Sequence, residues 1–328
     1  MAVAQRSFSA NPVLNPRIAV IVPNRNDSRH LPRCIRSLLA QDDPPDELIV
    51  VDDQSTDDSA ALIQSLISGQ SRARLLQNPE RLGTNGALNR GFDASRSEYV
   101  LFLSSNDFVL PGLFARARAG LARHPGVGLW SALGWLVDED DRVIRLHRSP
   151  VIALRDAYVT PAGCVRAAHR VGNWFVGSTL IYHRDALNAA GRFDSAYMGL
   201  ADLIATLIVA ARKGAVYSPV PFGVSRIHPG SNLSRTLAEG ANIDGILERL
   251  RAGGFPADTG LRSDAFLRRL ALRLRFAAVR SSAARTLPSR LRVALSFLRL
   301  CPFDVLPALW NRLLGSAVVL LLHGSRRP

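Results

Sequence analysis

Two stretches near the start of the chain, RIAVIVPNRN at residues 17–26 and LIVVDDQSTDD at residues 48–58, decide the expected fold. Each begins as an apolar run rich in β-branched residues, which is typical of a buried strand, and each ends in polar side chains. The segment between them has the spacing of one apolar helix face, with Asp27 or Ser28 placed to cap the helix. That face comprises Leu31, Cys34, Ile35, Leu38 and Leu39.

The same alternation continues along the chain. Further strands are expected at 72–78 and 98–104, with helices over about 57–68 and 85–95. Alternating strands and helices predict an α/β fold with a mostly parallel sheet flanked by helices. Ligands of such sheets bind outside the carboxyl ends of the strands.

Polar clusters fall at these strand ends. They are Pro23–Asn26, Asp52–Asp57, a glycine- and asparagine-rich segment from Arg81 to Gly91, and Ser104–Asp107. One such cluster alone has an ordinary explanation, because aspartates after strands often cap helices and glycines often permit close packing. Four clusters in this order favour a binding site. No GxGxxG follows the first strand, which disfavours a dinucleotide-dependent oxidoreductase.

The order of these motifs resembles the family 2 glycosyltransferases of the GT-A fold. IVPNRN and IVVDDQSTDD are similar to the opening of that family, and RLGTNGALNRGFDAS and EYVLFLSSNDFVLPGLF to its next two motifs. GSTLIYHRDALNAAGRFD is similar to its acceptor-side segment. The resemblance covers about residues 17–235 and implies an inverting transferase that uses a nucleotide diphosphate sugar.

For the nucleotide, the resemblance implies roles at matching positions. Asp53 would accept the imino NH of a uracil-like base, and Pro23 and Arg25 would flank that base. Arg81 would lie near the diphosphate, where a permanent cation suits phosphate oxygens. Asn106 would bond a ribose hydroxyl. Uridine is favoured by family habit, and thymidine or guanosine donors stay open.

For the metal, the resemblance implies Asp107 as the ligand of Mg²⁺ or Mn²⁺ bridging the two phosphates. His228 resembles a family histidine that sometimes reaches this region, although a loop histidine without a ligand role is the alternative. The usual acidic cluster is SSND here, with Ser104 and Asn106 in place of acids. Asparagine is a neutral, weaker metal ligand, so an inactive nucleotide-sugar-binding or scaffold subunit is a second reading.

Asp202 stands where the catalytic acid of the family usually falls. As general base it would take the proton of the acceptor hydroxyl, and direct attack on the anomeric carbon would invert configuration. The alternative is a helix N-cap, since Asp202 precedes the apolar segment LIATLIVAARKG. Both roles can hold together.

Positive charge is concentrated at the C-terminal end of the chain. The net charge is +14, and residues 251–328 hold 14 arginines against three aspartates. A helix from Ser263 would be basic and amphipathic. We therefore expect residues 256–328 to contact an anionic membrane or a polyanion, or to form a solvated arginine-rich face. Few interleaved aromatics and no recognised motif argue against nucleic acid. The apolar run at 313–322 is too short to span a membrane.

Three regions are expected: an N-terminal extension at 1–16, a GT-A domain at 17–235, and a basic helical region at 236–328. The GT-A domain would divide into a nucleotide-binding half (17–110) and an acceptor half (111–235). Expected partners are a nucleotide diphosphate sugar and a glycan or glycolipid acceptor. The first residues lack the apolar run of a secretory signal, so we expect a cytoplasmic enzyme, peripheral at the inner membrane face.

Overall fold

The computed structural model describes residues 15–147, 149–227 and 243–281. Their strands form one ten-stranded mixed sheet in the order β3-β2-β1-β4-β9-β6-β10-β5, with β7 paired to β6 and β8 to β10. The strands are β1 (Ile18–Asn24), β2 (Glu47–Asp52), β3 (Ala73–Gln77), β4 (Tyr99–Phe102), β5 (Phe108–Val109), β6 (Leu129–Val137), β7 (Val143–Leu146), β8 (Ala157–Val159), β9 (Ile181–His183) and β10 (Ala215–Arg226).

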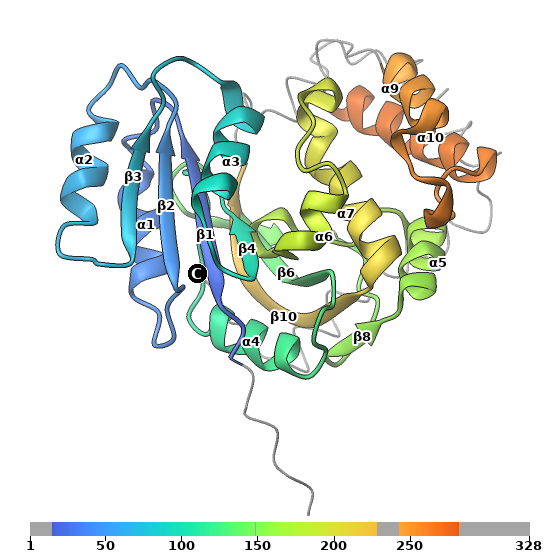
Figure 1. Ribbon diagram of the computed structural model, residues 1–328, viewed down its shortest axis with the longest axis horizontal. Helices are drawn as coiled ribbons and strands as arrows, with labels where there is room; N and C mark the ends of the chain where they lie inside the picture. The colour runs from blue at the N-terminus through green and yellow to red at the C-terminus, as the bar shows by residue number, and fades with distance from the viewer. Residues whose placement is uncertain (1–14, 148, 228–242, 282–328) are drawn as a thin grey trace, which may run out of the picture.

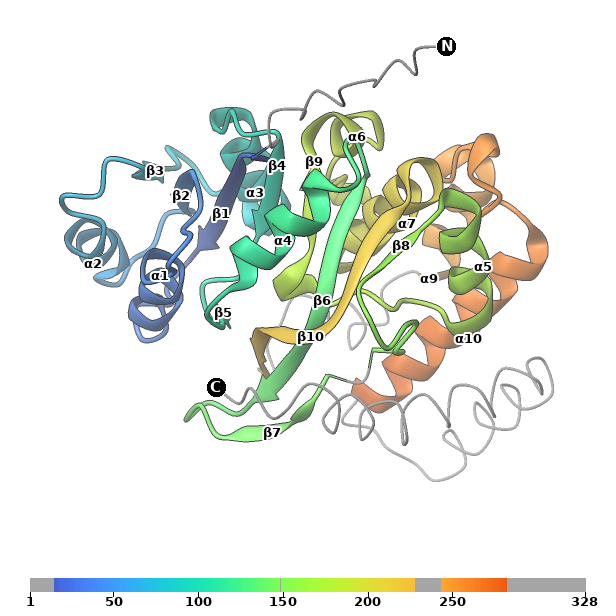
Figure 2. The ribbon, with the colours of Figure 1, turned by 90° about the horizontal axis from the view of Figure 1, so that it is seen from below.

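Helices cover both faces of this sheet (Figures 1 and 2). The α-helices are α1 (Leu31–Leu39), α2 (Ser59–Leu66), α3 (Gly83–Ala94), α4 (Leu113–Ala122), α5 (Pro161–Val171), α6 (Arg184–Ala189), α7 (Ala201–Lys213), α9 (Ile243–Arg249) and α10 (Asp264–Ser281). Short helical turns are η1 (Gly177–Thr179), η2 (Ser195–Leu200), η3 (Leu250–Gly254) and η4 (Ala257–Thr259).

The alternation of side chains along β1 shows how the layers form. Ile18, Val20 and Val22 pack with α1, α2 and α4 on one face. Ala19 and Ile21 point to the other face, toward α3 and the core around α5, α6 and α7. A strand covered on both sides needs apolar residues at every position, which explains the continuous apolar runs in the sequence.

The parallel part of the sheet is confirmed at its N-terminal half. β1 pairs in parallel with both β2 and β4, and β2 pairs in parallel with β3. β9 then runs antiparallel to β4 and β6. The carboxyl ends of β1, β2 and β4 therefore meet at one edge, where three of the four polar clusters begin.

Several local expectations needed correction. α1 starts after His30, and neither Asp27 nor Ser28 caps it through its side chain; the Asp27 carboxylate instead bonds His30 and Ser105. The segment at 125–180, for which no elements were assigned from the sequence, contains the nine-residue strand β6 and the eleven-residue helix α5. Thr160 caps α5 by accepting from the Gly163 N–H.

The basic helix α10 packs on the protein itself. Phe266, Leu267 and Leu270 of its apolar face are buried in the main core, beside α5 and α9 (Figure 1). Arg273 donates to the carbonyls of Ala168 and His169 at the end of α5, where a cation complements the helix dipole. The apolar face of this part of α10 is thus used for packing, and any membrane contact by it would have to be electrostatic.

One described stretch, Ser195–Lys213, is long and apolar enough to cross a membrane by length and composition. It consists of η2 and α7, and most of its most apolar window is buried within the protein. Packing against the sheet and α5 accounts for its composition, so we treat it as a core helix.

Candidate functional site

The first polar residues after β1 and β2 lock these two strand ends together. Asn24 lies beside Asp52 in the register and donates from Nδ2 to the Asp52 carboxylate at 2.9 Å. The Ser55 N–H donates to the other oxygen of Asp52 at 3.1 Å. Both Asn24 and Asp52 are buried. The first acid of the DD pair is therefore structural, since its bonds hold the loop after β2 in place.

The second acid, Asp53, connects β2 to the start of α3. Its Oδ1 accepts from Asn78 Nδ2 at 2.6 Å and from the Leu82 N–H at 2.8 Å, and its Oδ2 accepts from the Gly83 N–H at 2.9 Å. Asp53 is only 3% exposed. A nucleotide base would add a donor to a carboxylate that already organises the loop before α3. Base binding by Asp53 stays a prediction, and the position of the residue at the strand end is compatible with it.

The arginines expected at the nucleotide lie nearby on the surface. Arg25 follows β1 and Arg81 precedes α3, and both are exposed. Neither forms an ion pair with another residue in the part of the chain that the structure describes. Their charges are therefore uncommitted there, as a phosphate-binding role requires.

Asp107 and Asp202 line one pocket, although they lie far apart in the sequence. The pocket has a volume of about 270 Å³, which suits a single monosaccharide better than an oligosaccharide. It is lined by Pro23, Thr84, Asn85, Leu88, Phe102, Leu103, Ser104, Asp107, Gly177, Ser178, Leu180, Tyr182, Phe193, Met198, Gly199, Asp202 and Ser225.

The electrostatics of Asp107 are unusual. Burial raises the pKa of its carboxyl to about 7, and the negative charge of Asp27 acts in the same direction. The Arg226 N–H donates to its Oδ1 at 2.9 Å and opposes this shift. A carboxylate that is desolvated and only partly compensated attracts a cation. Asn106, next to it, is partly buried and accepts from Arg226 Nε through its backbone oxygen.

A metal at this position would depend largely on its other ligands. Across the described ranges no group of three or more His, Cys, Asp or Glu side chains is placed to hold a metal ion. Asp107 alone nevertheless fits a hard cation that takes its remaining ligands from phosphates and water. His228, the second expected ligand, lies outside the described residues.

Asp202 occupies the first turn of α7. Leu200 is the N-cap of that helix, so the alternative reading of Asp202 as the N-cap was wrong by two positions. Its Oδ1 accepts from the Leu203 N–H at 2.7 Å. The side chain is exposed to the pocket, but surrounding protein restricts its hydration, and this desolvation raises the pKa of the Asp202 carboxyl.

Sequence reasoning missed how the loops around this pocket are held. Asn85 Nδ2 donates to the Met198 carbonyl at 3.2 Å, and Asn89 Nδ2 donates to the Phe193 carbonyl at 3.1 Å. The i, i+4 spacing of these asparagines places them on one face of α3. From that spacing, one could have predicted that both asparagines bind the same neighbouring segment. In the structure this segment is the one before Asp202.

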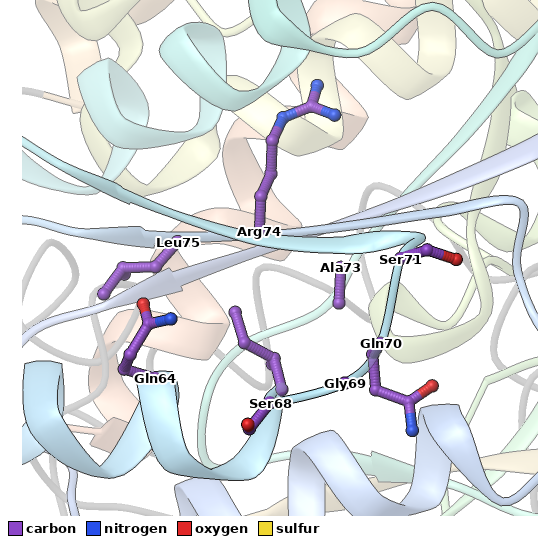
Figure 3. A pocket seen from close by; sticks show the side chains of 9 residues that line it. Gln64, Ser68, Gly69, Gln70, Ser71, Ala73, Arg74 and Leu75 are labelled. Carbon is purple, nitrogen blue, oxygen red and sulfur yellow. The ribbon is translucent and has the colours of Figure 1, made fainter.

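A larger hollow of about 570 Å³ lies between α2 and β3 (Figure 3). It is lined by Gln64, Ile67, Ser68, Gly69, Gln70, Ser71, Ala73, Arg74 and Leu75. These residues surround the amino end of β3, opposite the strand ends that carry the polar clusters. The hollow is an open surface depression and does not belong to the site.

The mixed sheet flanked by helices matches the fold of GT-A glycosyltransferases of known structure. Residues 19–170 match the family model described as Glycosyl transferase family 2. The matched residues include the motifs IVPNRN and IVVDDQSTDD, on which the resemblance to that family rests.

Solved structures and a curated relative show the same likeness. Staphylococcus aureus TarS 1–349 in complex with UDP-GlcNAc has a TM-score of 0.58 at 17% identity, covering 87% of this chain and 81% of that one. Mannosyltransferase PcManGT from Pyrobaculum calidifontis, with GDP-Man and Mn²⁺, has a TM-score of 0.56 at 20% identity, covering 98% and 91%. An uncharacterized Mycobacterium tuberculosis protein, MT1568, is 29% identical over 73% of this chain and 76% of its own length.

Proposed function

We propose that this protein transfers a sugar from a nucleotide diphosphate donor, with a UDP-sugar favoured, to a hydroxyl of a glycan or glycolipid. One observation carries the proposal: Asp107, at the end reached by β4, and Asp202, on α7, line the same monosaccharide-sized pocket. The proteins of similar fold whose structures contain UDP-GlcNAc or GDP-Man with Mn²⁺ support a donor of this class.

In the proposed reaction, the acceptor oxygen attacks the anomeric carbon on the side opposite the diphosphate. The bond from that carbon to the diphosphate oxygen breaks, its electron pair leaves with the nucleotide, and Asp202 takes the hydroxyl proton. Attack from the opposite side inverts the anomeric centre. The raised pKa of Asp202 favours proton acceptance, because it brings the carboxylate closer to the range of a working base.

Charge develops on the leaving diphosphate, and cations would stabilise it. Arg25 and Arg81 do not line the pocket, but they are exposed cations at the end of β1 and before α3. Asp107 would hold Mg²⁺ or Mn²⁺, which neutralises phosphate charge when bound. Asn106 would bond a ribose hydroxyl, and Pro23 and Arg25 would flank the base held by Asp53.

The test is a binding and hydrolysis screen of UDP, GDP and dTDP sugars with Mg²⁺, Mn²⁺ or EDTA. We expect one nucleotide to bind more tightly with metal and its sugar to be released slowly. Absence of binding by every nucleotide would overturn the proposal. Tight binding without hydrolysis or transfer would favour the second candidate, an inactive sugar-nucleotide-binding subunit, which Ser104 and Asn106 in the acidic motif suggest.

We also propose a cytoplasmic location at the inner face of the membrane, supported by the positive charge of residues 256–328. Because the apolar face of α10 is packed in the core, this contact would be electrostatic and salt-sensitive. Co-sedimentation of the full chain with phosphatidylserine vesicles at 50 and 500 mM salt checks it. Equal sedimentation with neutral vesicles would contradict it.

A further inference from the structure

One residue that lines the pocket, Met198, has a strained backbone conformation. Met198 lies in η2 with φ 49° and ψ −129°. This combination resembles the first central position of a type II′ turn, which glycine dominates because a Cβ is crowded there. A non-glycine residue in such a region costs stability and persists where the surroundings hold it.

The surroundings that hold it are on α3. The Met198 carbonyl accepts from Asn85 Nδ2 at 3.2 Å, and the chain five residues earlier is held by Asn89 through the Phe193 carbonyl. These bonds fix the backbone and would be the same with glycine at this position. They explain how the conformation is kept, and they give no reason for a methionine.

Core packing gives no reason either. Met198 is 40% exposed, which is high for a large apolar residue, and it lines the same pocket as Asp107 and Asp202. Under the proposed function, the transferred sugar occupies this space, since its anomeric carbon must reach both the diphosphate and the acceptor hydroxyl. The side chain is therefore placed to contact that sugar.

The apolar residues around Met198 in the pocket indicate which part of the sugar its side chain contacts. Leu88, Phe102, Leu180 and Phe193 line the same pocket and are buried or partly buried. The thioether of methionine is a weak hydrogen-bond acceptor, so it forms at most a weak hydrogen bond with a sugar hydroxyl. It packs well against methyl groups. We propose that Met198 is a specificity-determining residue that favours a sugar with an apolar substituent, such as the methyl of an acetamido group, over the sugar with a hydroxyl in that place.

Two variants of the full chain separate this role from a structural one. Met198→Ala removes the side chain beyond Cβ and keeps the strained backbone. Met198→Gly removes the whole side chain and also relieves the strain. Calorimetric titration would give the Kd of UDP, UDP-glucose and UDP-N-acetylglucosamine for each protein, and thermal unfolding would give the Tm. This inference rests on the proposed function, so bare UDP serves as the reference.

We expect the wild-type chain to prefer UDP-N-acetylglucosamine to UDP-glucose by about 10-fold, the scale of one buried methyl contact. Both variants should bring that ratio close to 1 and leave the Kd of UDP unchanged. The Tm of Met198→Gly should rise by about 2–4 °C, because the strain is released, and that of Met198→Ala should not.

An unchanged ratio in both variants, or a ratio near 1 in the wild type, would overturn the inference. A fall in the Tm of Met198→Gly would also overturn it, since the side chain would then be structural. Failure of the wild-type chain to bind UDP would overturn the uridine donor of the proposed function instead, which the reference titration shows separately.

Discussion

The backbone N–H of Arg226 donates to Oδ1 of Asp107 across 2.9 Å, while the guanidinium of the same arginine pairs with Asp141 at 2.5 Å. Arg226 ends β10, Asp107 lies between β4 and β5, and Asp141 lies between β6 and β7. One buried residue thus joins three chain segments at the pocket. Because its guanidinium is directed to Asp141, the Asp107 charge is only partly compensated.

The first prediction concerns the pH dependence of stability. The pKa of Asp107 is about 7 in the folded protein, above the ordinary value of 3.8. The folded state therefore binds more protons than the unfolded state between these values, and Asp107 lowers the free energy of unfolding as pH rises from about 4 to 7. Within that range the loss approaches about 1.4 kcal/mol for each pH unit.

Asp107→Asn should remove this penalty. We expect the variant to be more stable than the wild type at pH 8 by about 1–3 kcal/mol, and close to it at pH 4, in urea unfolding. Mn²⁺ should no longer strengthen nucleotide binding by the variant. A variant that is less stable at pH 8 would show that the buried carboxylate is fully compensated.

The second prediction concerns Arg226 as the link between the loops. Its guanidinium also donates to the carbonyls of Asn106, Asp138 and Glu139, and its side chain is 2% exposed. Removing one partner of a buried, hydrogen-bonded charge pair costs about 3–5 kcal/mol. Arg226→Met should therefore lower the free energy of unfolding by this amount.

Arg142 is the matched control for Arg226. It pairs with Asp140 in the same β6–β7 hairpin, but its side chain is 77% exposed. Arg142→Met should change the unfolding free energy by at most about 1 kcal/mol, as for other surface pairs. Similar losses in the two variants, measured by urea unfolding, would mean that burial of Arg226 does not decide its contribution.

The third prediction separates two roles of Asp53. Asp53→Ala leaves the N–H groups of Leu82 and Gly83 without their acceptor, which should destabilise the chain by about 1–3 kcal/mol. Loss of nucleotide binding in that variant alone would be ambiguous. Asp53→Asn keeps one acceptor oxygen and should restore part of the stability.

If Asp53 also accepts the imino N–H of the base, Asp53→Asn should bind UDP at least about 10-fold more weakly even where it is fully folded, since an amide replaces the charged acceptor. Titration calorimetry below the unfolding temperature measures this. UDP binding that tracks the folded fraction in both variants would confine Asp53 to its structural role.

Individual residues show which parts of the fold and of the site could be predicted from the sequence. The runs ending at Asn24 and Asp52 were predictable, because a strand buried on both faces must be apolar throughout, and the parallel order brings such ends together. The contacts of Arg226 were not predictable, since they depend on how far β10 extends and on which loops meet its end at Arg226. The conformation of Met198 was equally hidden, because nothing in a methionine signals a positive φ.

The fourth prediction concerns Asp202 as the base. Asp202→Asn keeps the bond from the Leu203 N–H possible but cannot accept the hydroxyl proton. We expect kcat to fall by about 10²–10⁴ while the Kd of the nucleotide changes less than twofold. Asp185 is the matched control, as an exposed acid in the first turn of the neighbouring helix α6. Asp185→Asn should retain wild-type kcat.

The pH dependence of kcat gives a second test of Asp202. Because desolvation raises the pKa of Asp202, the apparent pKa of the acidic limb of the kcat–pH profile should lie above the ordinary aspartate range. This limb should disappear in Asp202→Asn. A full kcat in Asp202→Asn would assign proton removal to another group.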